Sequence, residues 1–202
     1  MKYYTFTNIF SKEYNRNLLE KCKPLLMDGE TLDGFYGRGS TPAKQSHPTL
    51  HLNPNFDDFH NQILKRIKEE SGLDLKLERS WVNGTHGKKK DMLWHSHEAF
   101  GTDYAGVYSF AIWLKIPTQW EDQCKLPFLD GMKKSDKKAS IFEFEYHDIL
   151  GGVCNYGYRL DPSMEGCMVF FPATLRHTVY PFYNCDESRI SIAGNLWYRD
   201  RQ

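Results

Sequence analysis

Apolar positions near the N-terminus follow first a strand period and then a helical one. Residues 2–7 are rich in aromatic side chains, which is typical of a strand. Ser11 can cap a helix, and over residues 12–27 leucines and a cysteine recur at the spacing of one buried helix face. A second helical pattern starts at Asn55 or Asp57 and runs to about Ser71. We therefore expect a strand followed by two helices.

Beyond Gly72, which should stop the second helix, the apolar period shortens to that of strands. Six segments show it: residues 73–83, 104–116, 139–147, 166–171, 177–182 and 189–198. Several short strands separated by turn residues are typical of an antiparallel barrel or jelly roll. We expect a mainly β fold, with the two N-terminal helices bracing the outside of the barrel.

Two long polar stretches interrupt this pattern. Residues 28–54 are rich in glycine, proline and serine, which predicts a long loop that could act as a lid, with Tyr36 and Arg38 near its tip. Residues 118–138 form a charged insertion that ends in a lysine-rich run. We expect a solvated loop there, with nucleic-acid contact the less favoured interpretation.

Composition limits the partners. The chain has 202 residues, with 26 lysines and arginines against 26 aspartates and glutamates. This length predicts a single domain, residues 1–202, with the helical brace at about 1–72 and the barrel at about 73–200. The balanced charge creates no field that would recruit nucleic acid or a membrane, and no apolar stretch is long enough to span one. The sequence does not indicate an oligomeric state.

The five cysteines form no CxxC pair, and no secretory signal opens the chain. A reducing cytoplasm is therefore the expected location.

The candidate chemistry starts with two histidines, His95 and His97, that lie two residues apart. Side chains at that spacing project from the same face of a strand, so both can reach one metal ion. His177 follows an apolar strand that ends in a proline, and it could complete a facial set of three ligands. The alternatives are two surface histidines in a turn and a buried histidine bonded to the backbone. The combination favours a non-haem iron site.

Arg189 and Ser191 should lie on one side of the last strand, because Ile190 and Ile192 take the other. An arginine offers a planar fork for a carboxylate, and the nearby hydroxyl adds a third donor. The alternative is a surface salt bridge. Because the strand is hydrophobic and an unpaired interior arginine is costly, we favour a receptor for an organic acid.

With these residues in place, the sequence resembles the 2-oxoglutarate and Fe(II)-dependent oxygenases, specifically the small prolyl-4-hydroxylase-like members of marine bacteria and their viruses. The resemblance covers about residues 78–198. The matching segments are SWVN at 80–83, the His-x-His at 95–97, GVYSFAIWLKIP at 106–117, EGCMVFFP at 165–172 with His177, and RISIAGN at 189–195.

The resemblance implies a double-stranded β-helix, a jelly-roll or cupin-like barrel, with iron near one mouth. Fe(II) would be held by His95, His97 and His177. The cosubstrate 2-oxoglutarate would bind the iron and place its far carboxylate on Arg189 and Ser191, and O₂ would take the remaining position. The cosubstrate would be decarboxylated to succinate while the substrate is hydroxylated. Ascorbate is a further cofactor to consider.

One position departs from the family pattern. The usual motif is His-x-Asp or His-x-Glu, whereas here the second position is His97, which leaves the ferrous charge less compensated. Glu98 would point to the opposite face of a regular strand, so it could bind the metal only at a bulge. Asp103 belongs to the following turn. We keep His97 as the second ligand, ahead of Glu98 and Asp103.

Further residues are candidates for binding cosubstrate or substrate. Trp81 and Asn83 alternate with Val82, so both could face the barrel mouth, although packing is an equal explanation for the tryptophan. Tyr108 is a candidate hydrogen-bond donor to 2-oxoglutarate. Tyr36 and Arg38, on the long loop, are weaker candidates for contacting the substrate.

The resemblance favours a peptidyl residue such as proline as the substrate, with a small molecule as the alternative. It also admits a virus-encoded enzyme that acts in the cytoplasm of the host.

Two other functions remain open. The first is a cupin-like dioxygenase with three histidines that uses no 2-oxoglutarate, for which Arg189 and Ser191 would be irrelevant. The second is a non-catalytic jelly roll that binds a glycan or a protein and holds no metal.

Overall fold

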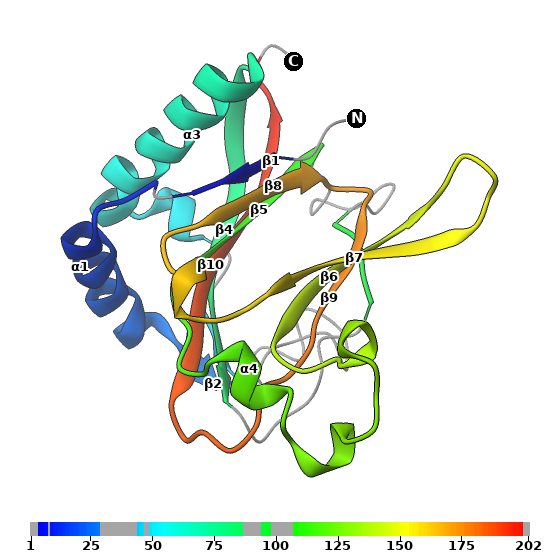
Figure 1. Cartoon of the computed structure of the whole chain (residues 1–202). Helices are drawn as coiled ribbons and strands as arrows, with labels where there is room; N and C mark the ends of the chain where they lie inside the picture. The colour runs from blue at the N-terminus through cyan, green and yellow to red at the C-terminus, as the bar shows by residue number, and fades with distance from the viewer. Residues whose placement is uncertain are drawn as a thin grey trace.

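The computed structural model describes residues 4–7, 9–28, 44–46, 49–86, 94–97 and 107–199 of the chain. Over this part the fold is mainly β, as expected, and consists of two antiparallel sheets (Figure 1). The larger sheet has the order β1-β8-β5-β10-β4-β3-β2, and the smaller has the order β7-β6-β9. The strands of the larger sheet are β1 (Tyr4–Phe6), β2 (Met27–Asp28), β3 (Lys44–Gln45), β4 (Leu75–His86), β5 (Tyr108–Lys115), β8 (Met168–Pro172) and β10 (Ser188–Tyr198). Those of the smaller sheet are β6 (Ile141–His147), β7 (Val153–Arg159) and β9 (Arg176–Val179).

The first helix begins where the sequence predicts and ends earlier. In α1 (Lys12–Cys22) the hydroxyl of Ser11 accepts a hydrogen bond from the backbone N–H of Tyr14 at 3.1 Å, which caps the helix. A 3-10 turn follows at Lys23–Leu25, and the next residues belong to β2. The prediction of a helix over residues 12–27 was therefore too long. Pro24 explains the early end, because it lacks the N–H that would continue the helix.

The second helix matches its prediction. It is α3 (Asp57–Ser71), and it ends at Gly72, which adopts the left-handed conformation with φ of 73° and donates its N–H to the Lys68 carbonyl. At 15 residues α3 is the longest described helix, and none of the described helices has the length and apolar character needed to cross a membrane.

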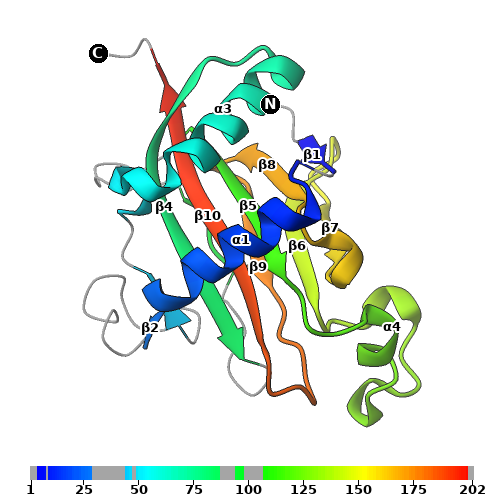
Figure 2. The ribbon, with the colours of Figure 1, turned by 90° about the vertical axis from the view of Figure 1, so that its left-hand side faces the viewer.

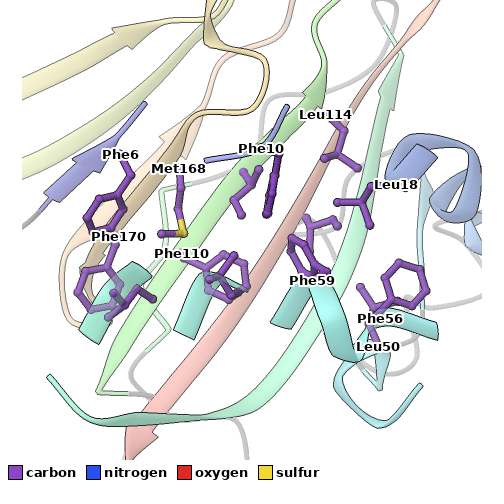
Figure 3. Close-up of a cluster of buried hydrophobic side chains, with 14 of the residues drawn as sticks. Phe6, Phe10, Leu18, Leu50, Phe56, Phe59, Phe110, Leu114, Met168 and Phe170 are labelled. Atoms are coloured by element: carbon purple, nitrogen blue, oxygen red, sulfur yellow. The ribbon is translucent and has the colours of Figure 1, made fainter. Parts of the chain in front are cut away.

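Both helices lie against the same face of the larger sheet (Figure 2). Figure 3 shows the core between the helices and this sheet, where aromatic and aliphatic side chains from the helices meet those of the strands. The helices contribute Leu18, Phe59 and Ile63, and the strands contribute residues such as Phe110 and Phe170. Burial of these side chains drives the packing of the helices, at about 25 cal/mol for each Å² of apolar surface removed from water.

The opposite face of the larger sheet meets the smaller sheet through a second core. Its buried members include Trp113 on β5, Phe171 on β8, and Phe142 and Phe144 on β6. Successive residues on a strand point to opposite faces, so Phe170 belongs to the helix-side core and Phe171 to the core between the sheets. The space between the sheets is where the candidate site lies.

The insertion at residues 118–138 is more ordered than a solvated loop. It contains the short helix α4 (Trp120–Gln123) and two 3-10 turns, Pro127–Leu129 and Lys134–Asp136. Trp120, Leu126 and Leu129 are buried in two small apolar clusters. The expectation held for the lysine-rich run itself, which is mostly exposed, and failed for the apolar residues that precede it.

Strand β7 has no counterpart among the predicted strands. It pairs only with β6, at the edge of the smaller sheet, and most of its side chains are exposed. Together β6 and β7 form a hairpin that projects from the body of the molecule (Figure 1). An edge strand with a central glycine, Gly157, carries a weak alternating pattern, which explains why the sequence did not reveal it.

Gly194 provides a test of the close packing of β10. A Cβ at this position would lie 2.6 Å from the backbone oxygen of Arg79 and 2.5 Å from the ring of Phe110. We predict that Gly194→Ala lowers the free energy of unfolding by about 1–3 kcal/mol, as overpacking does. In the control, Gly157→Ala, the nearest atom is the Ile141 Cγ2 at 3.0 Å, on a side chain that can move. Urea unfolding would measure both variants, and equal stability of the two would refute the prediction.

Candidate metal centre

Three histidines converge from two segments that are distant in the sequence. His95 and His177 form an isolated antiparallel bridge, in which each backbone N–H donates to the other residue's carbonyl at 3.0 and 2.9 Å. The N–H of His97 donates to the carbonyl of Ala173 at 2.9 Å. The segment that carries His95 and His97 is thus held beside β9 by backbone hydrogen bonds, without belonging to a regular strand.

The side chains of His95, His97 and His177 form a compact group, which we call the histidine cluster. One ring nitrogen from each lies within 4.8 Å of those of the other two. The ring centroids are 4.3 Å apart for His95 and His177, 4.9 Å for His97 and His177, and 5.3 Å for His95 and His97. Among the described residues, this is the group of histidine, cysteine and acidic side chains close enough together to hold a metal ion. A transition-metal ion suits three imidazoles at such spacing.

His177 is the most enclosed member of the cluster. Only 3% of the side chain is exposed, and its ring lies against Phe142, Phe144 and Phe171, with centroids 5.6, 6.3 and 4.9 Å away. Its Nδ1 lies 3.0 Å from the carbonyl oxygen of Leu175, which can only accept a hydrogen bond. Nδ1 therefore carries the proton and Nε2 offers a lone pair. Burial, together with the other two histidines, holds the pKa of His177 well below its usual value.

His97 is held by a different kind of partner. Its Nδ1 lies 2.7 Å from the amide oxygen of Asn195 and 3.0 Å from the hydroxyl oxygen of Ser109. Burial lowers the pKa of His97 to about 4, with a further contribution from His95, while the hydrogen bond with Asn195 acts in the opposite direction. Burial and the neighbouring His95 thus favour the neutral imidazole that a metal requires.

Arg189 is buried on β10, with 3% of its side chain exposed. Its guanidinium donates two long hydrogen bonds to the carbonyl of Tyr180, at 3.3 and 3.4 Å, and lies 5.2 Å from the centre of the Phe182 ring. Within the described part of the chain no carboxylate forms an ion pair with it. Burial alone lowers the pKa of Arg189, to about 10, so the group stays charged at neutral pH.

The arginine and the histidine cluster occupy the same side of the larger sheet. Ile190 and Ile192 belong to the helix-side core, so Arg189 and Ser191 point the other way, as the sequence predicts. Tyr180, which accepts from Arg189, follows His177 by only three residues, and three residues span at most about 11 Å. The Arg189 guanidinium therefore contacts the stretch of chain that carries His177.

Two predicted residues of β4 lie on this side as well. Trp81 packs against His97, with ring centroids 5.6 Å apart. Asn83 is two residues further along and lies directly opposite Ser191 on β10. The hydroxyl of Ser191 makes no hydrogen bond to any residue that the structure describes. Trp81, Asn83 and Ser191 therefore line the same space as the histidine cluster.

Tyr108 is placed elsewhere. It belongs to the helix-side core, where it stacks on Phe170 with centroids 4.7 Å apart. Burial raises the pKa of its phenol, with contributions from Tyr198 and Tyr4. The same face of β5 carries Phe110, whereas Ser109, which contacts His97, faces the other way. The structure thus separates Tyr108 from the histidine cluster, and we leave it out of the proposed cosubstrate site.

Four other residues named from the sequence lie outside the described residues. They are Tyr36 and Arg38 on the long loop, and Glu98 and Asp103 as alternative ligands. Ser109 and Asn195 contact His97 and were not among the candidates predicted from the sequence. A signal for Asn195 was present, because it follows Arg189 by an even number of residues on the same strand and therefore shares its face.

Comparisons with known proteins extend this description. No family model matches the sequence, and no curated protein matches it. Among solved structures, a prolyl-4-hydroxylase from Pseudomonas putida aligns with a TM-score of 0.63 at 15% identity, covering 98% of this chain and 92% of its own. A viral collagen prolyl hydroxylase from Paramecium bursaria Chlorella virus-1, in complex with 2OG, aligns with a TM-score of 0.57 at 11% identity. The alignment covers 97% of this chain and 96% of the viral protein.

A third neighbour is SnoN, the non-haem α-ketoglutarate-dependent epimerase of nogalamycin biosynthesis. It aligns with a TM-score of 0.64 at 13% identity and covers 96% of this chain and 77% of its own. At identities this low the alignments establish the fold and nothing further. The chain therefore has the fold that these prolyl hydroxylases and this α-ketoglutarate-dependent epimerase share.

Proposed function

We propose that the chain is a single-domain Fe(II)- and 2-oxoglutarate-dependent dioxygenase, a hydroxylase with a double-stranded β-helix fold. One observation carries this proposal: three histidines that can hold a metal share the space between the sheets with a buried guanidinium that no described carboxylate neutralises. The first group can hold a metal, and the second favours an anion. A cosubstrate that binds a metal at one end and carries a carboxylate at the other satisfies both.

The donor set fits ferrous iron. His97 and His177 each use Nδ1 in a hydrogen bond, so their Nε2 lone pairs are available, and His95 lies across from them in the cluster. Three imidazoles on one side leave positions for the cosubstrate and for O₂. Iron bound there would supply the activation of O₂ that is coupled to the conversion of 2-oxoglutarate to succinate. The cluster brings no negative charge, so the cosubstrate itself would balance the charge of the metal.

Arg189 would bind the far carboxylate of 2-oxoglutarate. The guanidinium can donate two parallel hydrogen bonds, and the hydroxyl of Ser191 adds a third donor from the same face. Leaving a buried charge unpaired costs several kcal/mol, so a buried guanidinium favours an anionic partner. Asn83, which lies opposite Ser191, would contact the cosubstrate or the substrate.

The aromatic side chains around His177 would exclude water from the reacting atoms. Phe142, Phe144 and Phe171 form an apolar wall on one side of the histidine cluster. Such a wall strengthens the electrostatic interactions inside the site and protects reactive species from water. Trp81 contributes a second aromatic surface beside His97 and is our candidate for contacting the substrate.

We infer a peptidyl residue as the substrate, and proline is the first to test. Two of the structural neighbours are prolyl hydroxylases, one of them a collagen prolyl hydroxylase. Tyr36 and Arg38 are retained as candidate substrate contacts. Replacing both with alanine should raise the KM for a peptide substrate while leaving substrate-free succinate production unchanged.

Arg189 favours this function over a cupin-like enzyme that uses three histidines without 2-oxoglutarate. Such an enzyme would have no use for a buried cation on the same side of the sheet. A non-catalytic binding module has no need for three converging imidazoles with free nitrogens. Metal binding and 2-oxoglutarate binding therefore separate the three functions.

Metal binding is the first testable consequence. We expect the metal-free protein to bind one Co(II) per chain, seen through its visible absorption, and His177→Ala to abolish binding because it removes an enclosed ligand. His147→Ala is a matched control, since His147 is exposed on β6 and bonds to the Gly151 carbonyl. Binding by His177→Ala with wild-type affinity would rule out the histidine cluster as the metal site.

Arg189→Met should separate binding from folding. Because the arginine is buried and no carboxylate of the described residues pairs with it, we expect the free energy of unfolding of the ligand-free protein to stay unchanged or rise. Calorimetry on the Co(II) protein should show affinity for 2-oxoglutarate falling by at least about 30-fold, or ~2 kcal/mol. Succinate production by the Fe(II) protein should fall with it.

The control for this variant is Arg176→Met, which removes an exposed arginine paired with Glu145. It should leave 2-oxoglutarate binding intact. If Arg189→Met kept wild-type affinity and instead lost several kcal/mol of stability, the arginine would be structural and the cosubstrate receptor would lie elsewhere.

A further inference from the structure

We propose that Asn195, held in place by Ser109, is a positioning residue that fixes His97 in the tautomer whose Nε2 faces the other two histidines. This inference rests on the proposed metal function. It extends that proposal to the second ligand position, where this chain has His97 and the family pattern has a carboxylate. Two neutral residues of the larger sheet would control the orientation of His97.

The geometry is compact and buried. Ser109 on β5 and Asn195 on β10 lie directly opposite each other in the antiparallel pair. Ser109 is fully buried and Asn195 is 4% exposed. The Ser109 hydroxyl donates to the Asn195 amide oxygen at 3.0 Å, and His97 Nδ1 lies 2.7 Å from that same oxygen. Both residues project from the face opposite Phe110 and Leu196, toward the space between the sheets.

The direction of the hydrogen bonds determines the tautomer. An amide oxygen has two lone pairs and no proton, so it accepts from both neighbours. One lone pair receives the single proton of the Ser109 hydroxyl, and the other receives a proton from His97 Nδ1. Because a neutral imidazole carries only one proton, Nε2 of His97 is then unprotonated. That atom is the one left to face the histidine cluster.

The alternative orientation of the amide would reverse this result. With its NH₂ group toward His97, Asn195 would donate to Nδ1, and the ring proton would move to Nε2. A protonated Nε2 cannot bind a metal ion. In that orientation the Ser109 hydroxyl would donate to His97 Nδ1, which lies 3.0 Å from it, so the orientation of the Asn195 amide decides which ring nitrogen of His97 is protonated.

His177 shows the same arrangement built from the backbone. Its Nδ1 donates to the carbonyl of Leu175, which is also a neutral acceptor. Two members of the cluster are thus oriented by oxygens that carry no charge. A carboxylate behind either ring would have made the ligand more basic and added negative charge. The neutral acceptors leave the positive charge of the metal available to an anionic cosubstrate.

Co(II) affinity of the metal-free protein tests this role. We expect Asn195→Leu, which keeps the branched shape and removes the acceptor, to weaken Co(II) binding about 10- to 100-fold. Asn195→Asp, which restores an acceptor oxygen, should bind Co(II) at least as tightly as the wild type. Ser109→Ala should weaken binding less than Asn195→Leu, because it removes only the support of the amide.

The chain offers a matched control for loss of a buried serine beside a histidine. Ser80 is fully buried on β4, and its hydroxyl lies 3.1 Å from His60 Nε2. Ser80→Ala should leave Co(II) affinity unchanged, because His60 belongs to α3 on the other face of the sheet. If Asn195→Leu bound Co(II) as tightly as Ser80→Ala does, Asn195 would have no positioning role.

Nuclear magnetic resonance of the metal-free protein tests the tautomer independently of the metal. Long-range ¹H–¹⁵N correlation should show His97 protonated at Nδ1 in the wild type and should show this preference lost in Asn195→Leu. A wild-type His97 protonated at Nε2 would overturn the inference. If the wild type showed the Nδ1 proton and its loss in Asn195→Leu but bound no Co(II), the positioning role would stand and the proposed metal function would fail.

Discussion

Strand β10 lies in the middle of the larger sheet and meets a different environment on each of its faces. Toward the helices it presents Ile190, Ile192 and Leu196, which belong to the helix-side core. Toward the smaller sheet it presents Arg189, Ser191 and Asn195. Because side chains alternate along a strand, a slip of one residue would exchange the two sets. The apolar burial that fixes the register of β10 therefore also fixes the proposed anion receptor and the partner of His97.

The candidate site combines two kinds of electrostatic requirement. Burial and the neighbouring histidines lower the pKa of His97 and His177, so both are neutral at physiological pH. Its arginine is charged and buried, with only a backbone carbonyl as a hydrogen-bond partner in the described chain. Adding a divalent metal would raise the positive charge further. An anion that contacts both groups would stabilise the folded protein as well as complete the site.

Local sequence patterns identified the parts of the site that depend on a single element. The period of two in residues 189–192 was sufficient to place Arg189 and Ser191 together, and the His-x-His spacing brought His95 and His97 to one side. Gly72 and Ser11 marked helix ends through their backbone chemistry. The β-rich fold also followed from the strand patterns.

The features that depend on pairing between elements could not be predicted from local sequence patterns. The alternation in β5 separates odd from even positions but does not say which set faces the histidines, so the sequence could not show that Tyr108 lies on the helix side. The role of Asn195 depends on its pairing with Ser109, which only the sheet order reveals. Strand β7 is stabilised by β6 alone and carries no buried stripe of its own.

The most direct test of the central claim is an anaerobic titration of the Fe(II)-loaded protein with 2-oxoglutarate, followed by visible absorption. The account predicts a weak metal-to-ligand charge-transfer band that saturates with the cosubstrate in the wild type and is absent from His97→Ala and Arg189→Ala. Fe(II) binding without such a band in the wild type would contradict the use of 2-oxoglutarate and favour the cupin-like function. Absence of Fe(II) binding would contradict the metal centre itself.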